Sequence, residues 1–172
     1  METERLIIDP IRETDHEAYF QNISHDRKVL ETFICNYTEK TEDLDISRYV
    51  NNPALFAIRL KETEQLIGIL VIVDEKDASC EIGYGIGSQY WQQGYTTEAV
   101  RRFIQYCFEE KGFQTIYAAF FTGNGASRRV MEKCGMRYHH FSEKELTYQG
   151  KERDLIYYAI TNQEGGKKIE HA

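Results

Sequence analysis

The chain has 172 residues and a formal net charge of −7 at pH 7, with 41% hydrophobic and 13% aromatic residues. This length predicts one domain, and the composition is globular rather than disordered. The acidic balance argues against a nucleic-acid-binding surface, which needs a basic face, and is compatible with a cationic or amine-bearing substrate.

The pattern of cysteines predicts reduced, buried thiols rather than a disulfide or metal site. None forms a CxxC pair, and none stands at metal-ligand spacing with a histidine. We therefore expect reduced thiols, no bound metal and a cytoplasmic location. The absence of a long apolar run or a signal peptide predicts no membrane partner. The four cysteines are Cys35, Cys80, Cys107 and Cys134.

The first part of the chain predicts one strand followed by short helices. Residues 5–10 form the strand. Residues 14–24 and 26–34 have the spacing of two short helices. Residues 41–52 predict a third, with Thr41 as its N-cap.

Strands dominate the middle of the chain. The apolar runs 55–60 and 66–74 predict a hairpin, and 78–87 predicts a further strand. Residues 96–112 form the most clearly amphipathic helix, with Gly112 as its C′ residue. The near-continuous apolar run 115–121 is typical of a central strand.

The unit from about 78 to 121 is strand–helix–strand, which implies two parallel strands and a right-handed crossover. Next, residues 124–136 predict a helix with Asn124 as N-cap and Gly135 as C′ residue. Residues 137–147 and 153–161 then predict a closing hairpin around 148–151, so the sheet is mixed. The polar residues 163–172 predict a frayed tail.

The segment EIGYGIG carries three alternating glycines, which weaken a strand unless a bare surface is needed. Regular alternation places Glu81, Gly83, Gly85 and Gly87 on one face, as a backbone trough with a carboxylate at one end. A bulge would break this alternation. An extended ligand suits such a trough.

The segment WQQGYTT, residues 91–97, directly precedes the amphipathic helix. Free amides and the helix dipole favour a phosphate there, Gly94 permits close approach, and Thr96 and Thr97 supply hydroxyls. The trough and the anion site together suit a neutral arm that ends in a pyrophosphate. An ordinary strand–helix connection with Thr as N-cap is the alternative. Neither GxGxxG nor GxxxxGK[ST] occurs.

Three stretches resemble the GCN5-related N-acetyltransferase (GNAT) superfamily, in its branch of ribosomal-protein-alanine acetyltransferases. They are EIGYGIGSQYWQQGYTTEAV, NGASRRVMEKCGM and RLIIDPIRETD, and the likeness extends over nearly the whole chain. The resemblance implies an α/β (α+β) single-domain fold over residues 1–162. It has a mixed central sheet of about seven strands flanked by helices, with parallel strands 4 and 5 splayed around acetyl-CoA.

The resemblance also implies which residues bind the acetyl donor. They are Tyr84, Gly85, Ile86, Gln92, Gln93, Gly94, Tyr95, Thr96, Thr97 and Asn124.

Two departures from the family pattern stand out. In the loop [R/Q]-x-x-G-x-[G/A], Trp91 occupies the first position, and Thr96 adds a side chain at the last. At Met131 many members carry a tyrosine that protonates the leaving thiolate, a role that methionine cannot fill.

Two residues are the catalytic candidates. Glu81 is the expected base that takes a proton from the amine, directly or through water; a solvated or salt-bridged strand residue is the alternative. Ser127 is the expected proton donor to the thiolate, against a local backbone contact as the alternative. A backbone N–H from 84–86 is the expected donor to the developing oxyanion.

Other polar residues have simpler interpretations. Arg128 and Arg129 fit a solvated helix face better than a phosphate contact. His139 and His140 lie in one strand, so at most one is expected to face the site. Tyr157 and Tyr158 are expected in the core and the hairpin.

The sequence thus predicts an acetyl-CoA-dependent N-acetyltransferase that acts on a primary amine. The acceptor is the N-terminal amine of a ribosomal or other protein, or a small amine, and the acidic residues 41–45 suit a cationic acceptor. A non-catalytic acyl-CoA-binding module on the same fold is the alternative. The oligomeric state stays open, with a homodimer among the alternatives.

Overall fold

The computed structural model describes residues 1–163, so the expected tail, except for Gln163, lies outside the described residues. Seven strands form one sheet in the order β1-β2-β3-β4-β5-β7-β6. β4 and β5 are parallel, whereas β1–β2, β2–β3, β5–β7 and β7–β6 are antiparallel. The expected mixed sheet is confirmed. The strands are β1 Leu6–Pro10, β2 Leu55–Leu60, β3 Leu66–Lys76, β4 Ser79–Ile86, β5 Thr115–Phe121, β6 Arg137–Tyr148 and β7 Lys151–Thr161.

The chain divides into two compact units, and β3, β4 and the helix α3, Tyr95–Glu109, each continue from one into the other. The first unit comprises residues 1–71 and 84–102, and the second comprises residues 72–83 and the chain from 103 onward. No helix among residues 1–163 combines the length and apolarity needed to cross a membrane.

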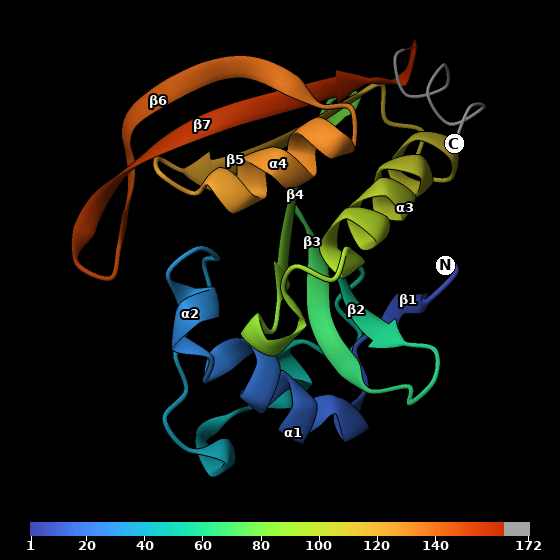
Figure 1. Ribbon diagram of the computed structural model, residues 1–172, viewed down its shortest axis with the longest axis vertical. Helices are drawn as coiled ribbons and strands as arrows, with labels where there is room; N and C mark the ends of the chain where they lie inside the picture. Colours follow the sequence, from blue (N-terminus) through green and yellow to red (C-terminus); the bar gives the residue numbers. More distant parts are fainter. Residues whose placement is uncertain (164–172) are drawn as a thin grey trace. The chain divides into compact units, whose positions relative to one another are not determined.

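The first unit is built on β1, β2 and the beginning of β3, with short helices packed on them (Figure 1). Alternate apolar side chains of the strands meet those of the helices and the following loop in one core. Burial of this apolar surface is the main contribution to the stability of the first unit. The buried members are Ile11, Tyr19, Ile23, Leu44, Ile46, Leu55, Ala57, Leu66 and Ile69.

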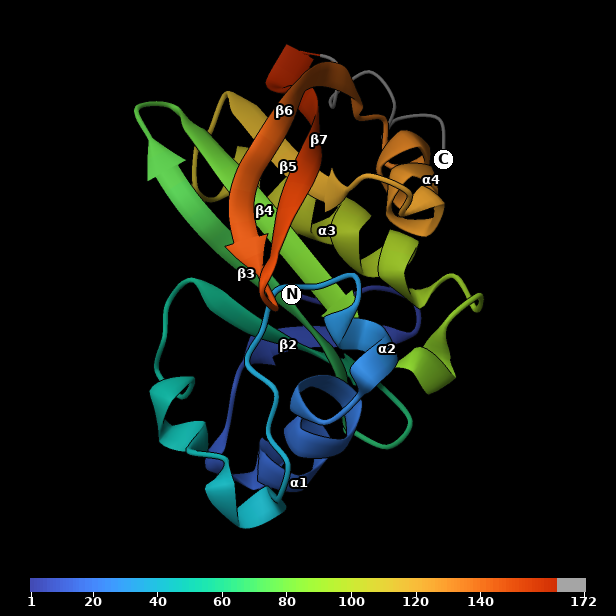
Figure 2. The ribbon, with the colours of Figure 1, turned by 90° about the vertical axis from the view of Figure 1, so that its left-hand side faces the viewer.

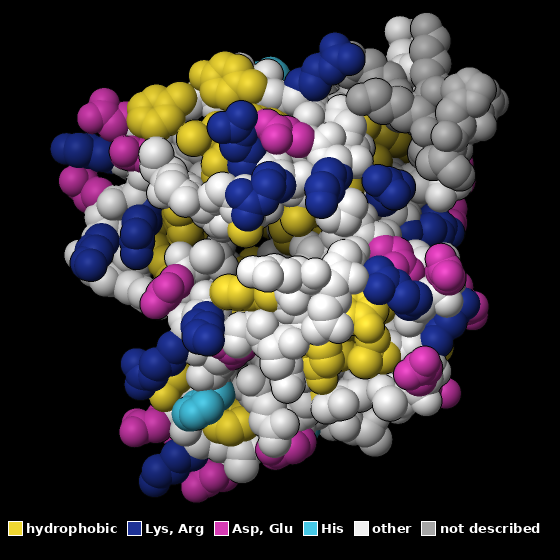
Figure 3. Space-filling view, in the orientation of Figure 1, with side chains coloured by type: hydrophobic (Ala, Val, Ile, Leu, Met, Phe, Trp, Pro, Cys, Tyr) yellow, Lys and Arg dark blue, Asp and Glu magenta, His cyan; other side chains and the backbone are white. Residues whose placement is uncertain are grey.

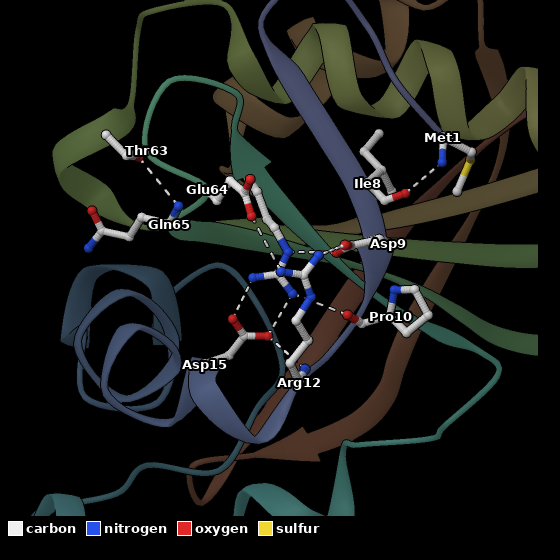
Figure 4. A network of polar contacts seen from close by, with 10 residues as sticks. Met1, Ile8, Asp9, Pro10, Arg12, Asp15, Thr63, Glu64 and Gln65 are labelled. Carbon is white, nitrogen blue, oxygen red and sulfur yellow. Dashed lines mark hydrogen bonds and ion pairs between the residues drawn. The ribbon is translucent and has the colours of Figure 1, made fainter.

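A buried arginine ties β1, β2 and the first helical turn together. The Arg59 side chain is 1% exposed, and its Nε donates to Asp9 at 2.6 Å while Nη2 donates to Asp15 at 2.7 Å and to the Pro10 carbonyl at 3.1 Å. Figure 4 shows this network with Arg12, which also pairs with Asp9. The buried charge of Arg59 is balanced by these partners. Removing either carboxylate would leave that charge less well compensated and would destabilise the fold.

The helices before β2 are shorter and less regular than expected. In place of the first expected helix the chain forms a 3-10 turn Glu13–Asp15, α1 His16–Tyr19 and a π-helix Phe20–Ser24. In place of the second, α2 covers only Arg27–Leu30. The expected helix over 41–52 is wrong, because only the 3-10 turns Thr41–Asp43 and Ile46–Arg48 form there. Thr41 is not an N-cap, because its hydroxyl donates to Glu17 instead. Packing of Leu44 and Ile46 into the core replaces a regular helix.

The second unit carries the β5–β7–β6 antiparallel ladder and α4, Gly125–Lys133 (Figure 1, Figure 2). Asn124 caps α4 by accepting from the Ser127 amide, and Gly135 has φ +88°, so both expected helix ends are confirmed. Gln149 and Gly150 both have positive φ, the two-residue turn that joins β6 to β7.

The expected stripe of α3 is confirmed. Val100, Phe103, Ile104 and Cys107 are all at most 3% exposed. The thiols of Cys80 and Cys107 contact one another in the core of the second unit, and this hydrogen bond and burial raise the pKa of Cys107. Gly112 follows the helix with φ +76°, as expected of a terminating glycine.

Candidate active site

The loop before α3 has the backbone geometry of an anion cradle. Gln92 has φ +62° and Gly94 has φ +84°, so left-handed residues alternate with right-handed or extended ones ahead of the helix. Such alternation turns successive amides toward one side. Residues 91–94 are exposed, and Tyr95, Thr96 and Thr97 form the first turn of α3. The first-turn amides of a helix have no partner within it and point along its positive end.

Arg5 and Glu98 hold this loop in place. Arg5 donates through Nη1 to the Gln93 carbonyl at 3.0 Å, and its guanidinium lies 4.4 Å from the centre of the Tyr95 ring. Glu98 accepts from Arg5 Nε at 2.7 Å, from the Arg5 amide at 2.9 Å and from the Thr3 hydroxyl at 2.6 Å. Burial alone would raise the pKa of Glu98, but these hydrogen bonds lower it below its ordinary value.

Trp91 has a structural task in the same turn. Its indole Nε1 donates to the Ile86 carbonyl at 2.9 Å, so it closes the connection between β4 and the loop.

The interpretation of the β4 glycines as a bare trough is wrong at two positions. A Cβ at Gly85 would meet the Phe33 ring at 2.9 Å, and one at Gly87 would meet the Asn22 side chain at 3.0 Å. Asn22 itself donates to the Leu66 carbonyl and accepts from Gln89. These glycines therefore admit the protein's own side chains, and the burial of both Gly85 and Ile86 breaks the expected alternation.

Glu81 lines a cavity in the second unit. β4 pairs with β5 over Ser79–Ile82 and Thr115–Ala118, which sets Glu81 beside Tyr117. The cavity has a volume of about 330 Å³. Burial raises the pKa of Glu81, and the charges of Asp74 and Glu145 raise it further. The lining is Asp74, Lys76, Ser79, Cys80, Glu81, Tyr117, His139, His140 and Tyr157.

The expectation that only one of His139 and His140 faces this cavity is wrong. The register of β6 against β7 shifts between Tyr138 and His140, so His139 is the extra residue of a β-bulge. Both rings consequently line the cavity, with their Nδ1 atoms 2.7 Å apart. Tyr157 was expected in the core, but it lies half-buried in the lining with its ring stacked on His140 at 4.4 Å.

The remaining candidates lie on α4. Ser127 is half-buried in the first turn, where its amide donates to Asn124 Oδ1 at 3.1 Å. Met131 is fully buried and belongs to the core. Arg128 pairs with Glu132 at 2.8 Å, and Lys and Arg side chains gather over α4 in Figure 3, which fits the expected solvated face.

The structure therefore groups the site residues into three local sets: the end of β4 with the loop 92–97, the cavity around Glu81, and the start of α4 with Asn124 and Ser127. Tyr84, Gly85 and Ile86 end β4 in the same unit as the loop 92–97. Glu81 lies in the cavity of the second unit, whose lining among the described residues does not include Asn124 or Ser127. Sequence reasoning missed Asp74, Lys76 and Tyr117. Only Tyr117 could have been found, because the expected parallel pairing of its strand with the strand of Glu81 places the two residues side by side.

The loop before α3 has the features of an anion site. Left-handed Gly94 and the first turn of a 15-residue helix provide amides and the positive end of a helix dipole for an anion, while Glu98 balances the charge of Arg5. Among residues 1–163 no group of three or more His, Cys, Asp or Glu side chains is arranged to hold a metal ion.

Comparison with known proteins agrees with this arrangement. Residues 5–137 match the acetyltransferase (GNAT) domain. The uncharacterized N-acetyltransferase YoaA of Bacillus subtilis is 27% identical over 93% of this chain and 95% of its own. A GNAT-family acetyltransferase structure from Bacillus anthracis has a TM-score of 0.83 at 28% identity, covering 95% of this chain and 99% of that one.

The chain therefore belongs to the GNAT acetyltransferase family and is an N-acetyltransferase, with acetyl-CoA as the donor that this family uses. The seven-stranded sheet with parallel β4 and β5 is the fold of that family. The fold is also shared with a Vibrio cholerae spermidine N-acetyltransferase in complex with CoA and spermine. The TM-score is 0.78 at 17% identity, over 95% of this chain and 99% of that one.

Proposed function

We propose that this protein transfers an acetyl group from acetyl-CoA to a primary amine by direct attack, with Glu81 as the proton acceptor. The observation that carries the proposal is the Glu81 carboxylate, half-buried in a 330 Å³ cavity and held at a raised pKa. Shifted carboxylates in cavities are characteristic of groups that exchange protons with substrates.

The donor is assigned to the loop and its neighbours. The amides of 92–97 would hold the diphosphate, while Tyr84–Ile86 and Asn124 would contact the pantetheine arm. Acetyl-CoA supplies the acetyl group as a thioester. Because Phe33 and Asn22 cover the faces of Gly85 and Gly87, the pantetheine arm would contact the backbone of β4 rather than lie in an open trough.

Glu81 prepares the acceptor. An aliphatic amine is mostly protonated at pH 7 and must lose a proton before its nitrogen can attack. A carboxylate with a raised pKa accepts that proton more readily than an ordinary one, because proton transfer is most effective when the pKa of the base lies near the working pH. The same carboxylate attracts the ammonium ion before the proton moves.

The reaction then forms a nitrogen–carbon bond and breaks the carbon–sulfur bond. A backbone N–H of 84–86 would stabilise the negative charge on the carbonyl oxygen. We assign Ser127 as the proton donor to the leaving sulfur, because the buried thioether of Met131 carries no acidic proton.

The proposed acceptors are the N-terminal amine of a protein, as in the ribosomal-protein branch that the sequence resembles, or a small amine. The test is thiol release from acetyl-CoA with a panel of short peptides and small amines. We expect turnover with at least one acceptor and its loss in Glu81→Gln. Saturable binding of acetyl-CoA without turnover for any member of the panel would instead favour the non-catalytic acyl-CoA-binding module.

We also propose a cytoplasmic location. All four cysteines are free thiols, and three of them are buried, which suits a reducing compartment. Fractionation of cells that express the tagged protein tests this, and recovery with secreted or membrane material would contradict it.

A further inference from the structure

The cavity around Glu81 has aromatic walls. Tyr157 stacks on His140 with ring centres 4.4 Å apart and planes 5° from parallel. Tyr117 meets His139 edge-on, with centres 5.2 Å apart. These rings come from β5, β6 and β7 and line the same cavity as Glu81 of β4. Faces of this kind pack against methylene chains and attract cations.

The cavity also carries an excess of negative charge. Asp74 and Glu81 belong to the lining, and Lys76 is its cation. Glu145 of β6 adds a third carboxylate close by, because its charge contributes, after burial and Asp74, to the raised pKa of Glu81. Burial and then the charges of Glu81 and Glu145 raise the pKa of Tyr157 to about 12. The like-charge repulsion is relieved when a cation enters.

From this combination of rings and carboxylates we infer that the acceptor carries a second cationic group, bound by Asp74 and Glu145 while Glu81 receives the reacting amine. The acceptor class is then a small aliphatic diamine or polyamine. This inference rests on the proposed function, because it assigns the acceptor of the same reaction. One terminal ammonium loses its proton and is acetylated, and the other stays charged and bound.

The geometry suits this class of substrate better than a monoamine. An alkyl chain between two ammonium groups packs on the Tyr117 and Tyr157 rings, and each end meets a carboxylate. Because the cavity is open to solvent at the exposed Asp74, the second charge contributes modestly and is screened by salt. We therefore expect a preference of about tenfold, equivalent to 1.4 kcal/mol.

The test compares 1,5-diaminopentane with 1-aminopentane, which share one carbon chain and differ in the second amine. We expect kcat/KM for the diamine to exceed that for the monoamine by about tenfold at low salt, and the ratio to fall as salt is added. In the double variant Asp74→Asn, Glu145→Gln this ratio should fall to near one.

The matched control is the double variant Asp77→Asn, Glu143→Gln. It makes the same change of charge on the same two segments, outside the residues that line the cavity, and Asn tolerates the positive φ of Asp77. The control should keep the diamine preference. An equal loss in both double variants would overturn the inference, because the effect would then be one of overall charge.

Two failures are distinguishable. If wild-type protein acetylates both amines with equal kcat/KM, the second-cation site is wrong and the proposed function stands. If neither aliphatic amine is acetylated but a peptide of the panel is, the diamine inference is wrong and the proposed function stands; if no member of the panel is acetylated, the proposed function is wrong. Calorimetric titration with 1,5-diaminopentane then decides on the site: binding weakened in the Asp74→Asn, Glu145→Gln variant but not in the control supports it, and absence of binding overturns it.

Discussion

Two glutamates, Glu98 at the start of α3 and Glu81 in β4, have opposite surroundings. Glu98 accepts hydrogen bonds from Thr3 and from the backbone and side chain of Arg5, and its pKa is lowered. Burial and the neighbouring charges of Asp74 and Glu145 raise the pKa of Glu81. The comparison separates a carboxylate that holds a loop in shape from one that we propose takes up a proton from the substrate.

The difference has a physical origin in the partners that each carboxylate meets. Hydrogen bonds to an ionised carboxylate stabilise the folded chain and keep the group charged. A carboxylate that faces like charges destabilises the folded chain slightly at neutral pH, and such carboxylates are frequent at functional sites. Substitutions of Glu81 and Glu98 test this difference.

The largest expected effect follows Glu81→Gln. Without a proton acceptor at this position we expect kcat to fall by about 10²–10³-fold, because general-base catalysis contributes a factor of that order. The KM for acetyl-CoA should change little. Thiol release with a saturating amine measures the effect, and a variant that retains half of the wild-type kcat would show that another group accepts the proton.

The next effect concerns the loop before α3. Gly94→Ala places a Cβ at φ +84°, 3.3 Å from Arg5 Nη2, and distorts the amide cradle. We expect the Kd for acetyl-CoA, measured by calorimetry, to rise by about tenfold, since an anion site depends on amide direction.

Gly112→Ala is its matched control, because Gly112 has φ +76° with nothing within 4 Å. Both substitutions carry a backbone strain of about 1 kcal/mol, so both should lower the melting temperature. Only Gly94→Ala should weaken binding. Equal Kd values for the two variants would remove the loop from the donor site.

A smaller effect on stability distinguishes the two glutamates. Glu98→Gln should lower the stability by about 1 kcal/mol, or about 2–4 °C in melting temperature, through weakened hydrogen bonds. Because the folded pKa of Glu98 is lowered, its contribution is present above the unfolded value of 4.5 and disappears as pH falls through the folded pKa. Melting curves of wild type and variant should therefore converge in acid.

Glu81→Gln should behave in the opposite way. The folded pKa of Glu81 is raised, so the ionised group costs stability as pH rises above 4.5. At pH 7 the variant should melt at or above the wild-type temperature. A clear decrease would mean that Glu81 is a structural carboxylate like Glu98.

The smallest effect is a change in pH dependence. Asp74→Asn removes a like charge from the Glu81 cavity and should lower the pKa of Glu81. The acid limb of the kcat/KM profile should then move to lower pH by a few tenths of a unit, an effect that salt diminishes. A shift to higher pH would contradict the proposed proximity of the two carboxylates.

Much of the fold followed from local patterns in the sequence. The apolar runs of the strands, the stripe of α3 and the two ends of α4 appear as expected, because each depends on residues a few positions apart. The helix expected over 41–52 failed because Leu44 and Ile46 serve a core built from distant strands.

The candidate site was less accessible to the same reasoning. Glu81 and the loop at Gly94 were visible as motifs, whereas the Phe33 ring over Gly85 joins residues far apart in the chain. The bulge at His139, which turns both histidines into the cavity, leaves no periodic signal. Long-range packing and bulges therefore account for the errors.

The most direct test of the role of Glu81 is the pH dependence of kcat/KM in wild type and in Glu81→Gln. The account predicts a wild-type acid limb with an apparent pKa above 4.5, the ordinary value for glutamate, and the disappearance of that limb in the variant. An acid limb at the same pH in both proteins would contradict proton transfer to Glu81.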